Sequence, residues 1–572
     1  MTLETFTRPP SLGAYLIGEG ANQRVQVMYD MPLGYPRRFV LVPVQVDETA
    51  PLKDQVRHVL PAGGAPEVPG LERGCYVNRV NLSPKGAYVE NVSPEQWPMG
   101  GNHVLMLLHY DQHTPDPDPV AVVDSARALL ADEEHGGFAK LRTGLLPQQA
   151  AAAAPATASR SAAKNPTDSS PAEAPPLRFV LASCQYPHDV LDRTPDPTAE
   201  GGYEPGPPDL SMMELARVFK GQRAWPARDP EAPSVLVLCG DQVYVDATAG
   251  LFDPTTLYDR FRRPYTLIRQ SRGGIELQRY QPARVHRLID DHEIDDGWAP
   301  GDNEKQAEYG RLGAEAYFEL QRAHAIGELG PNDPLPQADE ETLYGDTDFF
   351  FGDTRLHREV RTAADYKTKS ILGVAQEERL HSWLRQPPKS ASAARVVATP
   401  AMLLPRPLAV LADAHAALHC DSWCGYPKSL HALLALIARQ RLAGLVFVSG
   451  DEHLSGVATI TLYQGTELRA TLWSIHSSPM YAPYPFANGD AAELAETDTF
   501  KVHHPPDGAV AFSCSVEFEL APAGDGFAVV TMAADASTGR PFSVQWHRPA
   551  DASLKGLALG QRIKLGNHNA SG

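Results

Sequence analysis

Short, uninterrupted apolar runs in the second half of this 572-residue sequence limit its fold more than any other feature. A strand that is apolar on both faces has to be covered on both faces, which is typical of the parallel or mixed sheets of α/β proteins. The predicted strands are RFVLAS (178–183), SVLVLCG (234–240), RVHRLID (284–290), DFFFGD (348–353), ARVVATP (394–400), GLVFVSG (444–450) and RATLWSI (469–475). Helical periodicity between them predicts helices near 211–220, 304–325, 375–385 and 429–442.

The end of the sequence has a different pattern. After about residue 508, three runs are interpreted as antiparallel strands. We therefore expect a mixed sheet. These runs are AFSCSVEFELA (511–521), GFAVVTMAA (526–534) and SVQWHR (543–548).

Residues 147–176 divide the chain. They contain no aromatic, aliphatic-branched or methionine residue, so they cannot bury enough apolar area to offset the entropy of ordering. We interpret them as a linker between a domain at 1–146 and a domain at 177–572. The first domain has short alternating runs separated by Gly, Pro and Asn, and one helical stretch at 120–133, which together predict a β-rich, sandwich-like accessory domain.

Charge and hydropathy exclude several classes of protein. The formal net charge of −19 opposes bulk binding to nucleic acid, because that binding depends on Lys and Arg releasing counterions from phosphates. No apolar run is long enough to predict a membrane span. The first ten residues lack the basic and apolar regions of a signal peptide. We expect the cytoplasm by default, and secretion if the sequence is that of a mature chain.

Cysteine is sparse. Six cysteines in 572 residues do not make a disulfide framework. Cys420 and Cys424 have a C-x3-C spacing without a second pair nearby, which favours two free thiols over a zinc site.

Side chains able to bind metal follow five of the predicted strands. The carboxyl ends of strands in an open α/β sheet converge on the ligand site. Acidic groups in such a buried crevice would repel one another unless cations neutralised them. Gly240 and Gly450 precede two of these side chains and suit a turn that leaves the sheet with positive φ. These side chains are Cys184; Asp241 and Tyr244; Asp290, Asp291, His292 and Glu293; Asp353, with the cationic Arg355 two residues on; and Asp451 and His453.

The residue types favour more than one kind of ion. Cysteine, tyrosine and histidine suit iron or zinc, whereas an all-oxygen set suits calcium, magnesium or manganese. Asp241 could bridge two ions, and two ions about 3.5–4 Å apart clamp an in-line displacement at phosphorus.

Five ordered blocks resemble the PhoD-like alkaline phosphatase D family, a branch of the calcineurin-like metallophosphoesterases. The family resemblance implies an α/β/β/α sandwich with two mixed sheets, preceded by a β-sandwich domain. It also implies a phosphoester hydrolase acting as an alkaline phosphatase on monoesters or diesters. The blocks are SCQ (183–185), GDQVYVD (240–246), DDHE (290–293), DTRLHR (353–358) and SGDEH (449–453).

The resemblance further implies roles for individual residues. One metal would be held by Cys184, Asp241, Tyr244 and His453, and a second by the bridging Asp241 with Asp291 and Asp451. An Fe³⁺ and Ca²⁺ pair is implied, with Zn²⁺, Mn²⁺ and Mg²⁺ as alternatives. His292 would act beside the scissile phosphate as general acid or transition-state donor, and Arg355 would hold phosphate oxygens.

Structural interpretations stand beside these roles. Taken alone, Cys184 is more typical of a buried small apolar residue, and Arg355 is also typical of a structural ion-pair partner, as is Arg358. In DDHEIDD (290–296), Asp290 and Glu293 suit either support of the ligands or solubility, and Asp295 and Asp296 are expected at the surface.

The predicted function is hydrolysis of a phosphate ester by a metal-bound hydroxide that attacks phosphorus in line. A nuclease or phospholipase-D-like phosphodiesterase is the alternative within enzymes. A non-catalytic, metal-stabilised binding protein is the alternative outside them.

Overall fold

The computed structural model describes the backbone of six strands before residue 112 and, with gaps, residues 176–549. The longer gaps fall at 187–206, 221–232, 247–256, 278–283, 389–393, 407–413, 483–493 and 505–508. The predicted helix at 120–133 and all but the last residue of the predicted linker lie outside the described residues.

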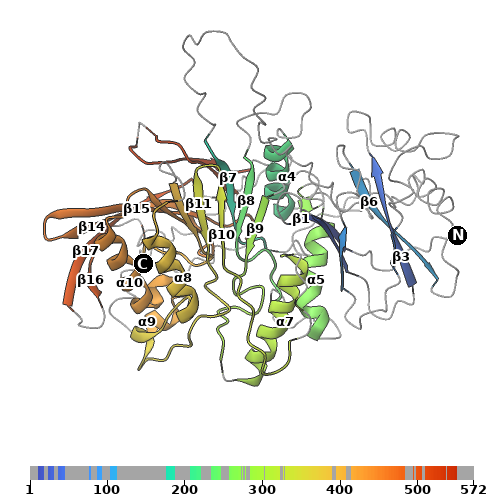
Figure 1. Ribbon diagram of the computed structural model, residues 1–572, viewed down its shortest axis with the longest axis horizontal. Coiled ribbons are helices and arrows are strands. Elements are labelled where there is room, and N and C mark those ends of the chain that lie inside the picture. The colour runs from blue at the N-terminus through green and yellow to red at the C-terminus, as the bar shows by residue number, and fades with distance from the viewer. Residues whose placement is uncertain are drawn as a thin grey trace, which may run out of the picture. The chain divides into compact units, whose positions relative to one another are not determined.

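A five-stranded sheet carries the first half of the predicted site. Strands β7, β8 and β9 run parallel in the order of the sequence, and β18 and β19 add antiparallel at the β7 edge (Figure 1). The sheet is therefore mixed. Its order is β19 (Ser543–His547), β18 (Phe527–Thr531), β7 (Arg178–Ala182), β8 (Val235–Cys239) and β9 (Arg284–Leu288).

An eight-stranded mixed sheet carries the second half. Its central strands β11, β12, β13 and β15 are parallel, and its other pairings are antiparallel. Its order is β10 (Glu340–Tyr344), β11 (Thr347–Phe351), β12 (Ala394–Ala398), β13 (Leu445–Ser449), β15 (Glu467–Ser477), β14 (Ser455–Gln464), β17 (Ala509–Leu520) and β16 (Asp498–His504).

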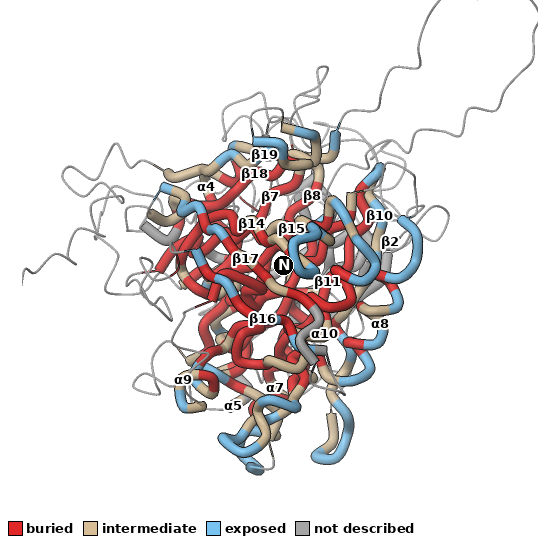
Figure 2. The backbone as a smooth tube through the Cα atoms, turned by 90° about the vertical axis from the view of Figure 1, so that its left-hand side faces the viewer, coloured by how far each residue is buried: buried red, intermediate tan, exposed pale blue. Residues whose placement is uncertain are grey.

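The two sheets pack against each other through one apolar core. Phe179 of β7 meets Phe349 of β11 edge to face, with ring centroids 5.5 Å apart. Figure 2 shows these strands buried inside the molecule. The continuous apolar runs of the sequence are therefore buried on both faces, as the pattern predicts. The strand residues in this core include Phe179, Leu181, Val235, Val237, Leu288, Phe349, Phe351, Val396, Val446, Val448, Ile475, Ala528 and Val530.

Helices cover the outer faces of both sheets. Tyr317 of α7 donates a hydrogen bond to Arg287 O in β9 at 2.7 Å, and Arg262 of α5 forms a buried ion pair with Glu319 of α7. On the other side, Trp383 of α8 and Leu433 of α10 share a core with the eight-stranded sheet. The helices are α4 (Pro207–Lys220), α5 (Leu257–Gln270), α7 (Glu304–Leu320), α8 (Gly373–Arg385), α9 (Ala414–His419) and α10 (Pro427–Gln440), with 3-10 turns η4 (Tyr366–Thr368) and η6 (Trp423–Gly425).

The layers run helix, sheet, sheet, helix, which confirms the predicted α/β/β/α architecture with mixed sheets. All of the strands and helices predicted after residue 177 are present, whereas β10, β14, β16, α5 and α9 were not predicted. The sheets belong to a compact unit of Leu177–Phe219, Val235–Leu277 and Arg284–Gly572.

The other compact unit comprises Met1–Pro176, Lys220–Ser234 and Gln278–Ala283. Its strands form two antiparallel three-stranded sheets, in the orders β1-β2-β5 and β4-β3-β6. Their packing into a sandwich stays a prediction, because their side chains lie outside the described residues. The strands are β1 (Ser11–Ile17), β2 (Arg24–Asp30), β3 (Arg37–Gln45), β4 (Tyr76–Asn78), β5 (Ala87–Val92) and β6 (His103–Asp111).

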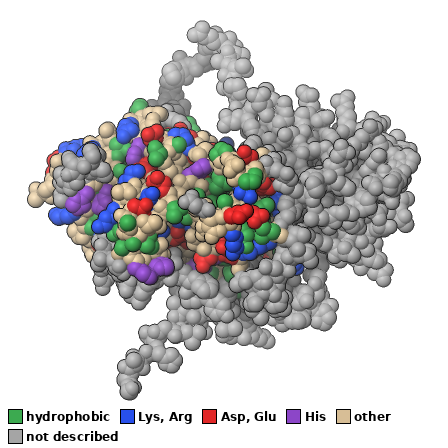
Figure 3. Space-filling view, turned by 90° about the horizontal axis from the view of Figure 1, so that it is seen from below, with side chains coloured by type: hydrophobic (Ala, Val, Ile, Leu, Met, Phe, Trp, Pro, Cys, Tyr) green, Lys and Arg blue, Asp and Glu red, His purple; other side chains and the backbone are tan. Residues whose placement is uncertain are grey.

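The surface of the described residues mixes charges of both signs. On the face shown in Figure 3, Lys and Arg side chains lie among Asp and Glu. Within the described part of the chain, every helix is too short or too polar to cross a bilayer.

Candidate metal centre

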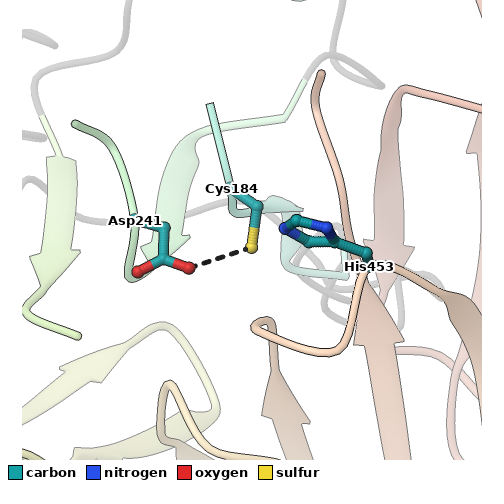
Figure 4. A group of neighbouring side chains, drawn as sticks. All are labelled: Cys184, Asp241 and His453. Carbon is teal, nitrogen blue, oxygen red and sulfur yellow. Dashed lines mark hydrogen bonds between the residues drawn. The ribbon is translucent and has the colours of Figure 1, made fainter. Parts of the chain in front are cut away.

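Three strand ends, two from the five-stranded sheet and one from the eight-stranded sheet, bring the first group of predicted ligands together. Cys184 lies two residues after β7, Asp241 two residues after β8 and His453 four residues after β13. Figure 4 shows the three side chains pointing toward one another. One ligand atom of each lies within 4.8 Å of the others. The fold therefore brings together three side chains that are far apart in the sequence.

Backbone geometry sets these residues apart. Only five non-glycine residues of the described part have positive φ, and four of them are predicted ligands. Left-handed backbone costs a non-glycine residue about 1–3 kcal/mol and persists only where the surrounding structure imposes it. Such strain concentrates at functional sites. The four are Cys184 (φ 56°), Asp241 (φ 55°), Asp451 (φ 71°) and His453 (φ 50°).

Backbone hydrogen bonds hold this strained geometry. Cys184 N donates to Gly240 O at 3.2 Å, and Gln185 N donates to Asp241 O at 2.7 Å. Gly240 has positive φ (85°), as predicted. Gly450 does not, which corrects that prediction: a Cβ there would lie 2.3 Å from Ser183 Cβ, so glycine is needed for close approach.

The sulfur side of the site combines thiol, phenol and imidazole. Cys184 Sγ lies 3.4 Å from Asp241 Oδ2 and 3.6 Å from Asp451 O. The hydroxyl of Tyr244 lies 3.2 Å from His453 Nε2. The four side chains predicted to hold one metal therefore come together.

The acidic side consists of four carboxylates. Asp241, Asp290, Asp291 and Asp451 each offer an oxygen within 4.8 Å of the others. Each also has one buried oxygen that accepts no hydrogen bond from any described residue. An unsatisfied buried carboxylate oxygen is costly unless a cation meets it. The buried carboxylate oxygens are therefore compatible with bound metal ions at this site.

The pKa values also reflect the cost of burying negative charge in this site. Burial raises the pKa of Asp241 well above its ordinary value, and the neighbouring Cys184 and Asp291 raise it further. Burial also raises the pKa of Asp451 far above normal and that of Cys184 to about 12. Burial lowers the pKa of His453 to about 4, which leaves a neutral ring able to bind a metal. Cations would remove the penalty on the negative charges.

His292 lies beside both groups. One of its atoms lies within 4.8 Å of ligand atoms of Asp241 and Asp291, and its ring packs on that of Tyr244 at 4.1 Å between centroids. Its Nδ1 is 2.9 Å from both carboxylate oxygens of Asp246. Burial lowers the pKa of His292, but Asp291 and Asp246 outweigh burial and raise it to about 9. The contact with Asp246 orients the ring, as a proton donor requires.

Arg355 has a different surrounding from the one predicted for it. Its side chain is fully buried, and its Nε donates to Asp290 Oδ1 at 2.7 Å. Its Nη1 donates to Trp298 O at 3.1 Å and its Nη2 to Asp421 Oδ2 at 2.5 Å. These donors face protein acceptors, and the role of Arg355 in holding phosphate oxygens stays a prediction. Arg358 also pairs with Asp421, as the structural interpretation predicts.

The sequence model of the PhoD-like phosphatase family matches residues 219–518, more than half of the chain. The chain belongs to the PhoD-like phosphatase family. No curated protein is similar enough to this sequence to count as a match.

Two solved structures are similar to the chain as a whole. One is described as PhoD, with a TM-score of 0.47, 14% identity, and coverage of 95% of this chain and 87% of the other. The second is purple acid phosphatase PPD1 from seeds of yellow lupin (Lupinus luteus), with a TM-score of 0.37, 12% identity, and coverage of 88% and 73%. The family assignment rests on the sequence match and not on these remote likenesses.

Membership of the family makes the protein a metal-dependent phosphoester hydrolase. The match begins after Cys184, so the role of that residue rests on the geometry described above. The predicted ligands and His292 all come together in this PhoD-like phosphatase. Strand β12 supplies no ligand, and Thr399 N just after it donates to Val448 O.

Sequence reasoning missed two acidic residues that support the site, Asp246 and Asp421. Asp246 lies inside the block GDQVYVD, so its presence in a signature was the available signal. Asp421 had no such signal. Of the acids in DDHEIDD, Asp290, Asp291 and Glu293 are buried, whereas Asp295 and Asp296 are more open, as predicted.

Proposed function

We propose that this PhoD-like phosphatase hydrolyses phosphate esters by in-line attack of hydroxide at a two-metal centre. One metal would be held by Cys184, Asp241, Tyr244 and His453. A second would be held by Asp241, Asp291 and Asp451. The observation that carries the proposal is the convergence of these groups, four of them on left-handed backbone, with buried carboxylate oxygens that accept no hydrogen bond from described residues.

The two ligand sets suit different ions. Thiolate, phenolate and imidazole favour a borderline or redox-capable ion, and we assign Fe³⁺ to that side. The all-carboxylate side favours a hard ion, and we assign Ca²⁺ there, with Mn²⁺ or Mg²⁺ as alternatives and Zn²⁺ as the alternative to iron. When bound, the ions supply a lowered pKa of water and neutralise charge in the transition state.

A side chain of the protein is proposed to donate the proton to the leaving oxygen. His292 lies beside the carboxylates with its Nδ1 against Asp246, so its Nε2 remains to donate a proton. General acid catalysis of this kind contributes about 10²–10⁴-fold in rate. Arg355 donates a hydrogen bond to Asp290 and so positions that carboxylate. Arg355 also donates to Asp421, which fixes the guanidinium.

The domain prediction is also part of the proposal. We propose that residues 177–572 form the catalytic domain and that residues 1–146 form an accessory domain, joined by a linker at 147–176.

The test combines metal analysis with two carboxylate variants. Asp241→Asn and Asp451→Asn should retain the fold but lower kcat for 4-nitrophenyl phosphate or bis(4-nitrophenyl) phosphate at least about 10³-fold, because a bridging or terminal ligand is lost. Asp339→Asn is the matched control, since this carboxylate is largely buried and pairs with Arg379 outside the site. Turnover at the wild-type rate in both site variants would refute the proposal. The ratio of the two substrates separates monoesterase from diesterase activity.

A further inference from the structure

Glu293, a carboxylate outside the proposed ligand set, joins two loops that carry candidate ligands. One loop follows β8 and is called the β8 loop, and the other follows β9 and is called the β9 loop. Glu293 is fully buried. Its Oε2 accepts from Asp241 N at 3.0 Å and from Asp290 N at 2.8 Å. Its Oε1 accepts from Gln242 N at 2.7 Å and, more weakly, from Val243 N at 3.4 Å. Glu293 therefore receives backbone N–H groups from both the β8 loop and the β9 loop.

A second carboxylate makes the link reciprocal. Asp246 of the β8 loop accepts from Asp296 N of the β9 loop at 2.7 Å, besides binding His292. Val245 N donates to His292 O at 2.9 Å. Each loop thus gives one carboxylate to the other loop, and Glu293 is the one that holds the left-handed turn at Asp241.

We propose that Glu293 is a positioning residue that fixes the bridging ligand Asp241 relative to Asp290 and Asp291, and hence the spacing of the metal ligands. This proposal rests on the metal centre of the proposed function. A carboxylate accepts on both oxygens, and hydrogen bonds to a charged acceptor are stronger than neutral ones. The same Oε2 atom accepts from Asp241 and Asp290, so a change in that atom moves one loop against the other.

An amide cannot reproduce this pattern. In Glu293→Gln, one oxygen becomes an NH₂ group, which faces backbone donors whichever way the amide is turned. If the NH₂ replaces Oε1, Gln321 can turn its own amide to accept from it, since Gln321 Nε2 lies 3.3 Å from Glu293 Oε1. The bonds to Gln242 and Val243 are then lost. Glu293→Asp keeps the charge but shortens the side chain by one methylene. The hydrogen bonds to both carboxylate oxygens should therefore weaken.

The experiment uses the metal-loaded protein as purified and needs no knowledge of the ions. EDTA is titrated, and the total metal retained after desalting is measured by elemental analysis. Thermal unfolding and kcat are measured on the same samples. The control is Glu377→Gln, because Glu377 is also a buried carboxylate that accepts from Ser370 and Ser429 but lies on α8, outside the site.

We expect Glu293→Gln and Glu293→Asp to release metal at about 10- to 100-fold lower EDTA and to lower kcat by a similar factor. Glu377→Gln should lower the unfolding temperature without either change. Wild-type EDTA resistance in both Glu293 variants, or equal losses of metal in Glu377→Gln, would overturn the proposal. Wild-type protein that holds metal but turns over no phosphoester refutes the proposed function alone, and the EDTA comparison still decides the role of Glu293.

Discussion

A methyl group added at Gly450 would meet atoms from two neighbouring strand ends. An ideal Cβ at this position lies 2.3 Å from Ser183 Cβ and 2.6 Å from Cys239 O. Carbon atoms pack at about 3.5–4.0 Å, so Gly450→Ala has to move these segments apart by roughly 1 Å. Because Gly450 does not have positive φ, the cost is steric and not conformational. Overpacking of this size destabilises by about 1–3 kcal/mol.

The displacement passes directly to the ligands. Gly450 precedes Asp451, and Ser183 precedes Cys184. A shift of about 1 Å in a reacting geometry costs about 100-fold in rate. We therefore expect Gly450→Ala to keep its fold, to lose kcat about 100-fold and to release metal at lower EDTA.

A matched glycine separates the site from general stability. Gly465, in the turn between β14 and β15, has φ of 62° and no atom within 4 Å of an added Cβ. Gly465→Ala should cost about 1–2 kcal/mol through its left-handed backbone while metal retention and kcat stay unchanged. Phosphoester kinetics, EDTA titration and thermal unfolding are compared for both variants. The reasoning fails if Gly450→Ala loses stability as Gly465→Ala does but keeps metal and kcat.

Two further predictions follow from the ligand set and its support. If the first ion is ferric, the protein should absorb visible light through a Tyr244-to-iron band that Tyr244→Phe lacks; a colourless, iron-replete wild type would remove Tyr244 from the ligands. Asp421→Asn leaves the buried Arg355 and Arg358 short of a counter-charge and should lower the free energy of unfolding in urea by about 3 kcal/mol. A loss no larger than that of the exposed control Asp365→Asn would contradict the importance of this network.

Most of the buried strands could be predicted from the sequence, whereas the interior strand β14 and the edge strands β10 and β16 could not. Strands β8, β11 and β13 are buried at every residue, so their apolar runs were unmistakable. Strands β10 and β16 lie at the two ends of the eight-stranded sheet, and β10 alternates between intermediate and exposed residues. The order of the strands in the sheets could not be predicted from the sequence, because β18, near the end of the chain, pairs with β7.

The candidate ligands could be predicted because each follows a strand within a few residues. Their supports could not, because each support is defined by a partner distant in sequence. Asp246 and His292 are 46 residues apart, Glu293 and Asp241 are 52, and Asp421 and Arg355 are 66. A buried carboxylate that accepts hydrogen bonds from backbone N–H groups cannot be distinguished in a sequence from a carboxylate exposed to solvent.

Left-handed backbone distinguishes the ligand residues in a way that local folding does not explain. The fifth such residue, Arg441, ends helix α10, and a left-handed residue there is a common way to terminate a helix. Cys184, Asp241, Asp451 and His453 follow strands, where glycine would adopt the same φ without strain but would offer no side chain. The chain keeps thiol, carboxylate and imidazole groups at positions that favour glycine, and what glycine lacks there is a side chain that could bind the proposed metal ions.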